Sequence, residues 1–595
     1  MRAYARPLER STSDAVLVSF QAAKAIARGL AEEHSDIPRL RLARMFCQTA
    51  LEEYWLETCS ANGIRWKVLP PPSIADHLDV AALNLAQEAG HILASAPADL
   101  AGYLAGTLYT AMLPDTTRST LGAYYTPPGV VERLMDLAQQ SGFDWSKGSM
   151  IDPACGGGAF LAPAALRMWG KIPGGSAISM LQSIASRLQG IEIDPFAGWM
   201  SRVLLEAAML PLCKEANQRM PDIVSVADAL ALAPERQFDL VIGNPPYGRV
   251  TLDAEMRQRY ARSLYGHANL YGLFTDLAMQ LAKPGGAIAY VTPTSFLGGQ
   301  YFKSLRGLLA QQSQLCAMDF VTDREGVFDN VLQETMLAVF RRQPSTRQSV
   351  SVHFLEPATL DKAVTVESVG RFSLEVSENP WLLPRDRAQA RIMPRLLDMP
   401  HRLREYGYTV STGPLVWNRH KSQLRSGKSG RNVFPLIWAE SVLADGEFKF
   451  KAEKRDHVPY IQLDESQGFL VVREACVLIQ RTTSKEQNRR LVAAVLPIEF
   501  LRINRGAVVE NHLNVVRRIR EDGVSPETIC ALLNSRAVDW AYRCISGSVA
   551  VSAYELEALP LPDKPQLRAL ERLVLGRSSR EVVEGAIARM YGVTA

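Results

Sequence analysis

The stretch Asp239-Leu-Val-Ile-Gly-Asn-Pro-Pro-Tyr-Gly248 constrains the fold more than any other part of the sequence. Asp239 to Ile242 read as the end of a buried strand, and the two prolines cannot continue it because they lack backbone donors. The chain must therefore turn sharply at the carboxyl end of this strand. Ligands bind at that end of an open α/β sheet, so an amide, a carbonyl and an aromatic ring would face a ligand there. An ordinary proline turn without function is the alternative, unless a cofactor site lies upstream.

Length and cysteine usage set the broad class. A chain of 595 residues is too long for one core and predicts several domains. Its eight cysteines form no Cys-x-x-Cys pair, which argues against structural zinc and against a disulfide framework. No window approaches the ~18 apolar residues of a membrane span. We expect a soluble cytoplasmic protein without a membrane partner.

The charge is unevenly distributed. The net charge is only +4, yet residues 401–520 hold 21 basic and 12 acidic side chains, so the remainder of the chain is net negative. A regional basic excess indicates a module that binds a polyanion, although a solvated basic face has the same composition.

Upstream of the proline turn, Ser149-Met-Ile-Asp-Pro-Ala-Cys-Gly-Gly-Gly-Ala-Phe160 combines a short apolar strand, an acid at its end and three glycines. Glycines there let a ligand approach the backbone. The spacing is neither the dinucleotide G-x-G-x-x-G nor a P-loop with its lysine. Asp152 therefore suits a ligand that carries an ammonium group better than one that carries a pyrophosphate.

Two further strands end in acids. Gly190-Ile-Glu-Ile-Asp-Pro195 places Glu192 where it can accept hydrogen bonds from ribose hydroxyls, and Ile193 where it can pack on an adenine ring. The strand Ile223 to Val226 ends near Asp228, which could accept from an adenine amino group. Each acid alone could equally be a helix cap. Four successive strands with suitable groups at their carboxyl ends favour one shared site.

The amino-terminal hundred residues have apolar side chains at helical spacing, as in Arg39 to Phe46 and Asp79 to Ala86. No nuclease signature is present in them, so a helical docking or DNA-supporting domain is expected. After this region, Thr126 is predicted to cap a helix from Val130 to Gln139.

The order Tyr124-Tyr-Thr-Pro-Pro128, Asp152-Pro-Ala-Cys-Gly-Gly-Gly-Ala-Phe160, Glu192-Ile-Asp-Pro195, Asp228 and Asn244-Pro-Pro-Tyr247 resembles the gamma-class adenine-N6 DNA methyltransferases of bacterial restriction-modification systems. The similarity spans about residues 122–340. It implies an α/β fold of the class I S-adenosylmethionine-dependent methyltransferases, Rossmann-like with a mixed, mostly parallel sheet. A helical amino-terminal domain and an α+β carboxyl-terminal target-recognition domain are expected on either side.

The resemblance also implies roles for individual residues. The catalytic residues would be Asn244, Pro245, Pro246, Tyr247 and Phe302, with Tyr301 and Phe296 as competitors for the last role and a core aromatic as the alternative for all three. The cofactor, S-adenosylmethionine, would contact Tyr125, Thr126, Pro127, Asp152, Ala154, Cys155, Gly156, Gly158, Phe160, Glu192, Ile193, Asp228, Asn244 and Pro246.

These residue types suit the chemistry. The adenine N6 is a poor nucleophile because its lone pair is delocalised into the ring. If Asn244 Oδ1 and the Pro245 carbonyl each accept one N6 hydrogen, the lone pair is freed for direct attack on the methyl group. Tyr247 would stack on the flipped-out base. Neither a metal nor a strong general base is needed.

The resemblance divides the chain into a helical domain (1–118), a catalytic domain (119–343), a connecting segment (344–400) with a tether near Pro380 to Pro394, a target-recognition domain (401–562) and a helical tail (563–595). The implied partners are double-stranded DNA and a cognate restriction endonuclease or defence-complex subunits, in the bacterial cytoplasm at the nucleoid. Methylation of a protein glutamine amide and a non-catalytic DNA-binding subunit are the alternatives. DNA contacts are expected from Trp417, Arg419, Lys421, Arg425, Arg431, Arg481 and Lys485.

Overall fold

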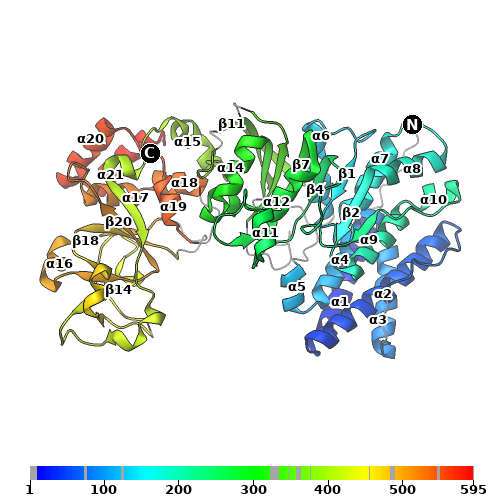
Figure 1. The fold of residues 1–595 in the computed structure, drawn as a ribbon, viewed down its shortest axis with the longest axis horizontal. Coiled ribbons are helices and arrows are strands. Elements are labelled where there is room, and N and C mark those ends of the chain that lie inside the picture. The colour runs from blue at the N-terminus through cyan, green and yellow to red at the C-terminus, as the bar shows by residue number, and fades with distance from the viewer. Residues whose placement is uncertain are drawn as a thin grey trace. The chain divides into compact units, whose positions relative to one another are not determined.

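The computed structural model describes residues 10–72, 77–121, 126–321, 334–345, 348–356, 364–374, 377–454, 456–482, 489–545 and 550–593 (Figure 1). Contacts divide the chain into two compact units. The first comprises residues 1–293 and 304–376, and the second comprises residues 294–303 and 377–595.

A nine-stranded sheet forms the centre of the first unit, in the order β11-β10-β8-β9-β7-β4-β1-β2-β3. The neighbours from β7 to β3 are all parallel, whereas β9 runs antiparallel to both β7 and β8. The predicted mixed, mostly parallel sheet is therefore confirmed. Its strands are β1 (Met150–Asp152), β2 (Leu188–Glu192), β3 (Val224–Val226), β4 (Phe238–Gly243), β7 (Ala282–Pro293), β8 (Gln314–Val321), β9 (Thr335–Arg341), β10 (Gln348–Glu356) and β11 (Thr365–Leu374).

Strands β10 and β11 correct one expectation. Their residues were assigned to a connecting segment, but β10 pairs parallel to β8 and antiparallel to β11. Val350 and Val352 are fully buried while the residues between them are not. This alternation of apolar and polar side chains is the pattern of a strand with one covered face.

The first unit also contains helices that precede these strands or lie between them in the sequence. They are α6 (Pro128–Gln140), α7 (Leu161–Lys171), α8 (Ala177–Arg187), α9 (Pro195–Ala208), α10 (Leu210–Ala216), α11 (Ala254–Arg259), α12 (Leu270–Leu281) and α14 (Lys303–Gln312), and a small hairpin joins β5 (Arg249–Val250) to β6 (Ala268–Asn269). The predicted cap of α6 was wrong. Pro127 is the residue before the first turn, and no side chain caps that helix.

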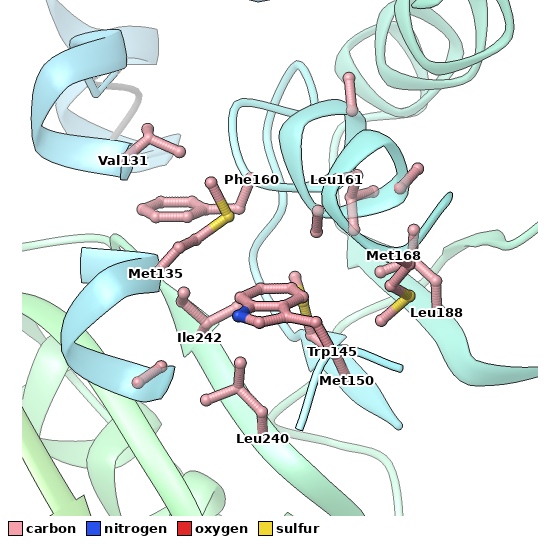
Figure 2. Close-up of a cluster of buried hydrophobic side chains, with 14 of the residues drawn as sticks. Val131, Met135, Trp145, Met150, Phe160, Leu161, Met168, Leu188, Leu240 and Ile242 are labelled. Carbon is pink, nitrogen blue, oxygen red and sulfur yellow. The ribbon is translucent and has the colours of Figure 1, made fainter. Parts of the chain in front are cut away.

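One apolar core lies between α6, α7 and the sheet (Figure 2). Figure 2 shows Met135 and Phe160 close to Ile242, and Trp145 beside Met150 and Leu240. All six of these apolar residues are at most 2% exposed. The core therefore holds β1 and β4 side by side, directly beneath the turns that follow them.

The amino-terminal helices are continuous with this unit. They are α1 (Arg10–Glu32), α2 (Asp36–Ala61), α3 (Val80–Ala94), α4 (Ala98–Met112) and α5 (Asp115–Leu121). A second buried cluster combines side chains of α1 to α4 with Phe196, Trp199, Met200 and others of α9. Helix α9 thus has β2 and β3 on one side and α2 and α4 on the other. Helical structure is confirmed here, in a core that α9 shares.

The second unit is α+β, as expected. Its strands form a four-stranded sheet, β12-β20-β17-β18, and a five-stranded sheet, β13-β15-β14-β19-β16. The strands are β12 (Tyr408–Thr412), β13 (Leu424–Arg425), β14 (Val433–Ile437), β15 (Tyr460–Gln462), β16 (Val471–Val472), β17 (Cys476–Gln480), β18 (Ala493–Leu496), β19 (Ala507–Val509) and β20 (Leu513–Arg518).

The helices of this unit are α13 (Ser295–Gly298), α15 (Arg387–Asp398), α16 (Ile498–Asn504), α17 (Pro526–Leu533), α18 (Arg536–Ile545), α19 (Ala553–Glu557), α20 (Lys564–Leu575) and α21 (Arg580–Met590). The tether expected near Pro380 to Pro394 is wrong. Trp381 and Leu383 are buried there, and most of α15 follows. The remaining domain boundaries stay predictions.

Among the described residues, no single helix has the length and apolar character of a membrane span, and only α9 and α10 reach that standard together, across a 68° bend.

A leucine pair tests the role of the core beneath the turns. Leu240 in β4 is fully buried, whereas Leu232 is 43% exposed. We expect Leu240→Ala to lower the free energy of unfolding by about 2–5 kcal/mol, because it leaves a cavity against α6. Leu232→Ala should change it by less than about 0.5 kcal/mol. Urea denaturation of the two variants measures the difference, and equal stability would contradict the assigned core.

Candidate active site

A cavity of about 380 Å³ opens at the carboxyl edge of β1, β2, β3 and β4, within the first unit. Parallel neighbours bring the four strand ends together there, although they are far apart in sequence. Most of the residues predicted to act on a cofactor line this cavity, namely Thr126, Asp152, Ala154, Cys155, Gly156, Phe160, Glu192, Ile193, Asp228, Asn244 and Pro246.

Some predicted residues lie next to the cavity without lining it: Pro127, Gly158, Pro245 and Tyr247. Gly158 has a φ of +84°, and a Cβ added to it would come within 2.6 Å of Ser201 Oγ. Glycine is thus required there for close packing against α9, and it does not line the cavity. Tyr125 lies outside the described residues.

The charge of the cavity selects its ligand. Five acids line it, Asp152, Glu192, Asp194, Asp228 and Asp253, and no lysine or arginine is among the described residues of its wall. A phosphate would be repelled by this wall, whereas a cationic ligand would be attracted.

Asp152 ends β1 and is 1% exposed. Its Oδ1 accepts a hydrogen bond from Ala154 N at 3.1 Å, and a Cβ added to Gly243 would come within 2.7 Å of the same oxygen. The carboxyl group therefore lies against the end of β4, one residue before Asn244. Burial raises the pKa of Asp152 to about 8, and the neighbouring Glu192 charge adds to this shift.

Glu192 ends β2 and is held by two backbone donors. Gly156 N donates to Oε2 at 2.8 Å, and Asp194 N donates to Oε1 at 2.9 Å. Gly156 has a φ of +53°, which directs its N–H toward the acid, and a Cβ there would point into open space. Burial raises the pKa of Glu192, while these two donors oppose the rise. Each carboxylate oxygen keeps acceptor capacity for a ligand hydroxyl.

Asn244 follows β4 and is held from both ends of its amide. Nδ2 donates to Thr126 Oγ1 at 3.1 Å, and Oδ1 accepts from the Tyr247 hydroxyl at 2.7 Å. Tyr247 is 9% exposed, and its ring meets the edge of Tyr271 at 6.0 Å between centroids. The Thr126 hydroxyl thus helps to orient the side-chain amide of Asn244, and it does not cap helix α6. A carbonyl oxygen has two lone pairs, so Oδ1 can accept a second hydrogen bond.

The three aromatic candidates after β7 belong to residues 294–303 of the second unit. Phe296 is 3% exposed and packs edge-on against Trp381, as a core aromatic does. Tyr301 is 42% exposed, and Phe302 is partly buried. The role assigned to Phe302 stays a prediction.

Some of the basic side chains predicted to bind DNA make hydrogen bonds within the protein, and others are exposed. Arg425 donates to Gln462 Oε1 and Ser422 O, and Arg481 donates to Asn511 O. Arg419, Lys421 and Arg431 are exposed, and the Lys421 ammonium lies 5.4 Å from the centroid of the partly buried Trp417 ring. Lys485 lies outside the described residues.

The structure adds residues that the sequence did not single out. Leu270 and Phe274 of α12 line the cavity. Val250 to Asp253 and Met256 come from the segment after the proline turn. Tyr109 of α4 also lines the cavity, and no sequence motif marked it.

Residues 211–328 match the family model described as Eco57I restriction-modification methylase. The chain is 26% identical to the Type II methyltransferase M.BsuBI of Bacillus subtilis over 58% of this chain and 70% of the relative. It is 26% identical to the Type II methyltransferase M.PstI of Providencia stuartii, over 57% and 68%.

One solved structure aligns with nearly the whole chain. It is that of the Type IIL restriction-modification enzyme MmeI in complex with DNA, at 13% identity, with a TM-score of 0.50, covering 99% of this chain and 97% of that one. At this identity the likeness concerns the fold alone.

Sheet topology and the strand-end cavity define a class I methyltransferase fold. Within that class the chain is similar to the Eco57I-type restriction-modification methylases over residues 211–328, as its motifs indicated.

Asp152 gives the site a measurable dependence on pH. The folded protein keeps this proton up to about pH 8, whereas the unfolded chain loses it near pH 4, so wild-type stability should fall as the pH rises between these values. Asp152→Asn has no proton to lose. We expect it to be more stable than wild type by about 1–3 kcal/mol at pH 8, with a smaller gap at pH 5.

Urea denaturation at both pH values measures this gap, with Asp398→Asn at an exposed position as the control. An Asp152→Asn protein that is equally stable relative to wild type at pH 5 and pH 8 would contradict a buried protonated acid.

Proposed function

We propose that the protein transfers a methyl group from S-adenosylmethionine to N6 of a flipped-out adenine in double-stranded DNA. The observation that carries this proposal is the Asn244 amide, held by Thr126 and Tyr247 at the wall of an acid-lined cavity. The curated relatives are named Type II methyltransferases, which supports a role as the modification component of a restriction-modification or phage-defence system.

The residues of the cavity fit this cofactor. Asp152 would accept from its ammonium group, Glu192 from its ribose hydroxyls and Asp228 from its adenine amino group, with Ile193 and Phe160 as apolar walls. A cation suits the acidic lining, and its binding would lower the pKa of Asp152. When bound, S-adenosylmethionine supplies an activated methyl group, so no metal is invoked.

Asn244 and Pro245 would act on the target base. Asn244 Oδ1 accepts one N6 hydrogen through its second lone pair, and the Pro245 carbonyl accepts the other. Both acceptors are in place before the base arrives, so little reorganisation accompanies the charge that develops on N6. Tyr247 would contact the base through its ring while its hydroxyl holds the Asn244 amide.

The second unit would bind the DNA. The excess of nine positive charges between residues 401 and 520 is suited to a phosphate backbone. Exposed Arg419, Lys421 and Arg431 are the best candidates for contact, whereas Arg425 and Arg481 first serve the fold.

One assay tests the proposed reaction. Protein is incubated with radiolabelled S-adenosylmethionine and unmethylated genomic DNA, and the nucleosides are then separated. We expect label in N6-methyladenine. Label in protein would instead indicate a glutamine-amide methyltransferase, and absence of label would indicate a binding subunit without turnover.

The matched control for this assay is Asn244→Ala. It should lose nearly all transfer while its dissociation constant for S-adenosylhomocysteine changes by less than about threefold, because the acid-lined pocket is intact. Full turnover in this variant would sink the mechanism even if adenine is methylated.

The Tyr247 hydroxyl and ring should make separable contributions. Tyr247→Phe removes the hydroxyl that donates to Asn244 Oδ1, so we expect kcat to fall about tenfold, or about 1.4 kcal/mol, with DNA affinity unchanged. Tyr247→Ala should lose a further ~1–3 kcal/mol through the missing ring contact. Single-turnover rates and DNA dissociation constants measure the two effects, and wild-type kcat in Tyr247→Phe would rule out the hydroxyl's role.

A further inference from the structure

Two side chains of the amino-terminal helices reach the turn that follows β2. Arg44 of α2 donates through Nη2 to Asp194 Oδ1 at 2.9 Å, and the Tyr109 hydroxyl of α4 donates to Asp194 Oδ2 at 2.8 Å. Asp194 Oδ1 also accepts from Phe196 N at 3.1 Å and so caps α9. Both carboxylate oxygens of Asp194 thus accept hydrogen bonds. The donor to Oδ2 is Tyr109, which lies 85 positions earlier in the chain.

Tyr109 and Asp194 of this cluster are buried and lie at the cavity. Tyr109 is 1% exposed and Asp194 is 4% exposed, and both line the cavity beside Glu192 and Ile193. The Tyr109 ring packs on Phe196 with 5.0 Å between centroids, within the core that α2, α4 and α9 share. The position of Tyr109 is therefore fixed by packing as well as by its hydrogen bond.

The cluster acts on Glu192 through the backbone. Asp194 N donates to Glu192 Oε1 at 2.9 Å, so the orientation of the Asp194 residue sets that of the Glu192 carboxylate. Removing the Tyr109 hydroxyl would leave a buried carboxylate oxygen without its donor, which the turn could relieve only by moving. Removing the Arg44 cation would leave the buried Asp194 charge without its ion-pair partner.

We propose that Arg44 and Tyr109 are positioning residues for the adenosine half of the cofactor, and that the amino-terminal helices are thereby part of the cofactor site. This inference rests on the proposed function. Asp194 is the element through which both residues act, and Glu192 is the group that contacts the ribose.

Binding of two ligands distinguishes an effect on the adenosine half of the cofactor from an effect on its amino-acid half. S-adenosylhomocysteine carries both the adenosine and the amino-acid half of the cofactor, whereas 5′-methylthioadenosine carries the adenosine half alone. Full-length Tyr109→Phe and Arg44→Gln should each raise the dissociation constants of both ligands by the same factor, about tenfold. Asp152→Asn should weaken S-adenosylhomocysteine far more than 5′-methylthioadenosine, because the ammonium group is absent from the latter.

The double variant adds a further test. Arg44 and Tyr109 act through one carboxylate, so Tyr109→Phe combined with Arg44→Gln should lose less than the product of the two single losses. Tyr54→Phe is the matched control, since Tyr54 is 3% exposed in the same helical core and does not line the cavity. It should leave both dissociation constants unchanged, whatever its effect on the melting temperature.

Isothermal titration calorimetry measures the dissociation constants, and thermal unfolding reports stability. Variants that lose stability but keep wild-type affinity for both ligands would overturn the inference and leave the proposed function standing. Loss confined to S-adenosylhomocysteine would also overturn it, by placing the effect at the amino-acid half. A wild-type protein that binds neither ligand would overturn the proposed function, and the inference with it.

Discussion

Burial of carboxyl groups at the carboxyl edge of the parallel strands is the constraint on which the rest of the site depends. Taking Asp152 and Glu192 out of water raises the pKa of both, and backbone N–H groups of Ala154, Gly156 and Asp194 offset only part of this cost. The fold tolerates these acids because the core beneath β1 and β4 fixes the strand ends that carry them. A cationic ligand would offset the remaining cost, so the acidic wall is consistent with a binding site for such a ligand.

The sequence predicted the parts of the site that depend on short-range order. A strand, a turn and a polar residue at the strand end occur within ten residues, and parallel pairing then brings such ends together, as for Asp152, Glu192 and Asn244. The sequence did not predict contacts between residues that are far apart in the chain. Threonine is a residue type that often caps a helix. The Thr126 hydroxyl, however, accepts a hydrogen bond from Asn244, 118 positions later in the chain. Strands β10 and β11 were missed because both carry several polar residues and so resemble a connecting segment.

The amino-terminal helices illustrate the same limit on a larger scale. Their helical periodicity is a local property and was predicted, but their attachment to α9 depends on side chains such as Phe196 and Trp199 that read as ordinary apolar residues. Trp199 Nε1 also donates to Leu69 O, and Arg219 pairs with Glu206 while donating to Lys67 O. Helix α9 therefore has to satisfy two neighbours at once, since it packs on β2 and β3 as well. A helix that is packed on both sides, such as α9, transmits a displacement from one side to the other, because packed interiors deform little.

The two acceptors proposed for an adenine amino group are held in different ways. Pro245 has its φ fixed by its own ring, and Pro246 restricts the backbone of the residue before it, so the direction of the Pro245 carbonyl follows from covalent geometry. The Asn244 amide has no such restriction and depends on two hydrogen bonds, one that it donates to Thr126 and one that it accepts from Tyr247, in separate segments. Substitutions around the site should therefore shift the Asn244 amide more than the Pro245 carbonyl. Changes in the surrounding packing reach Asn244 first, while the Pro245 carbonyl moves only if the end of β4 moves.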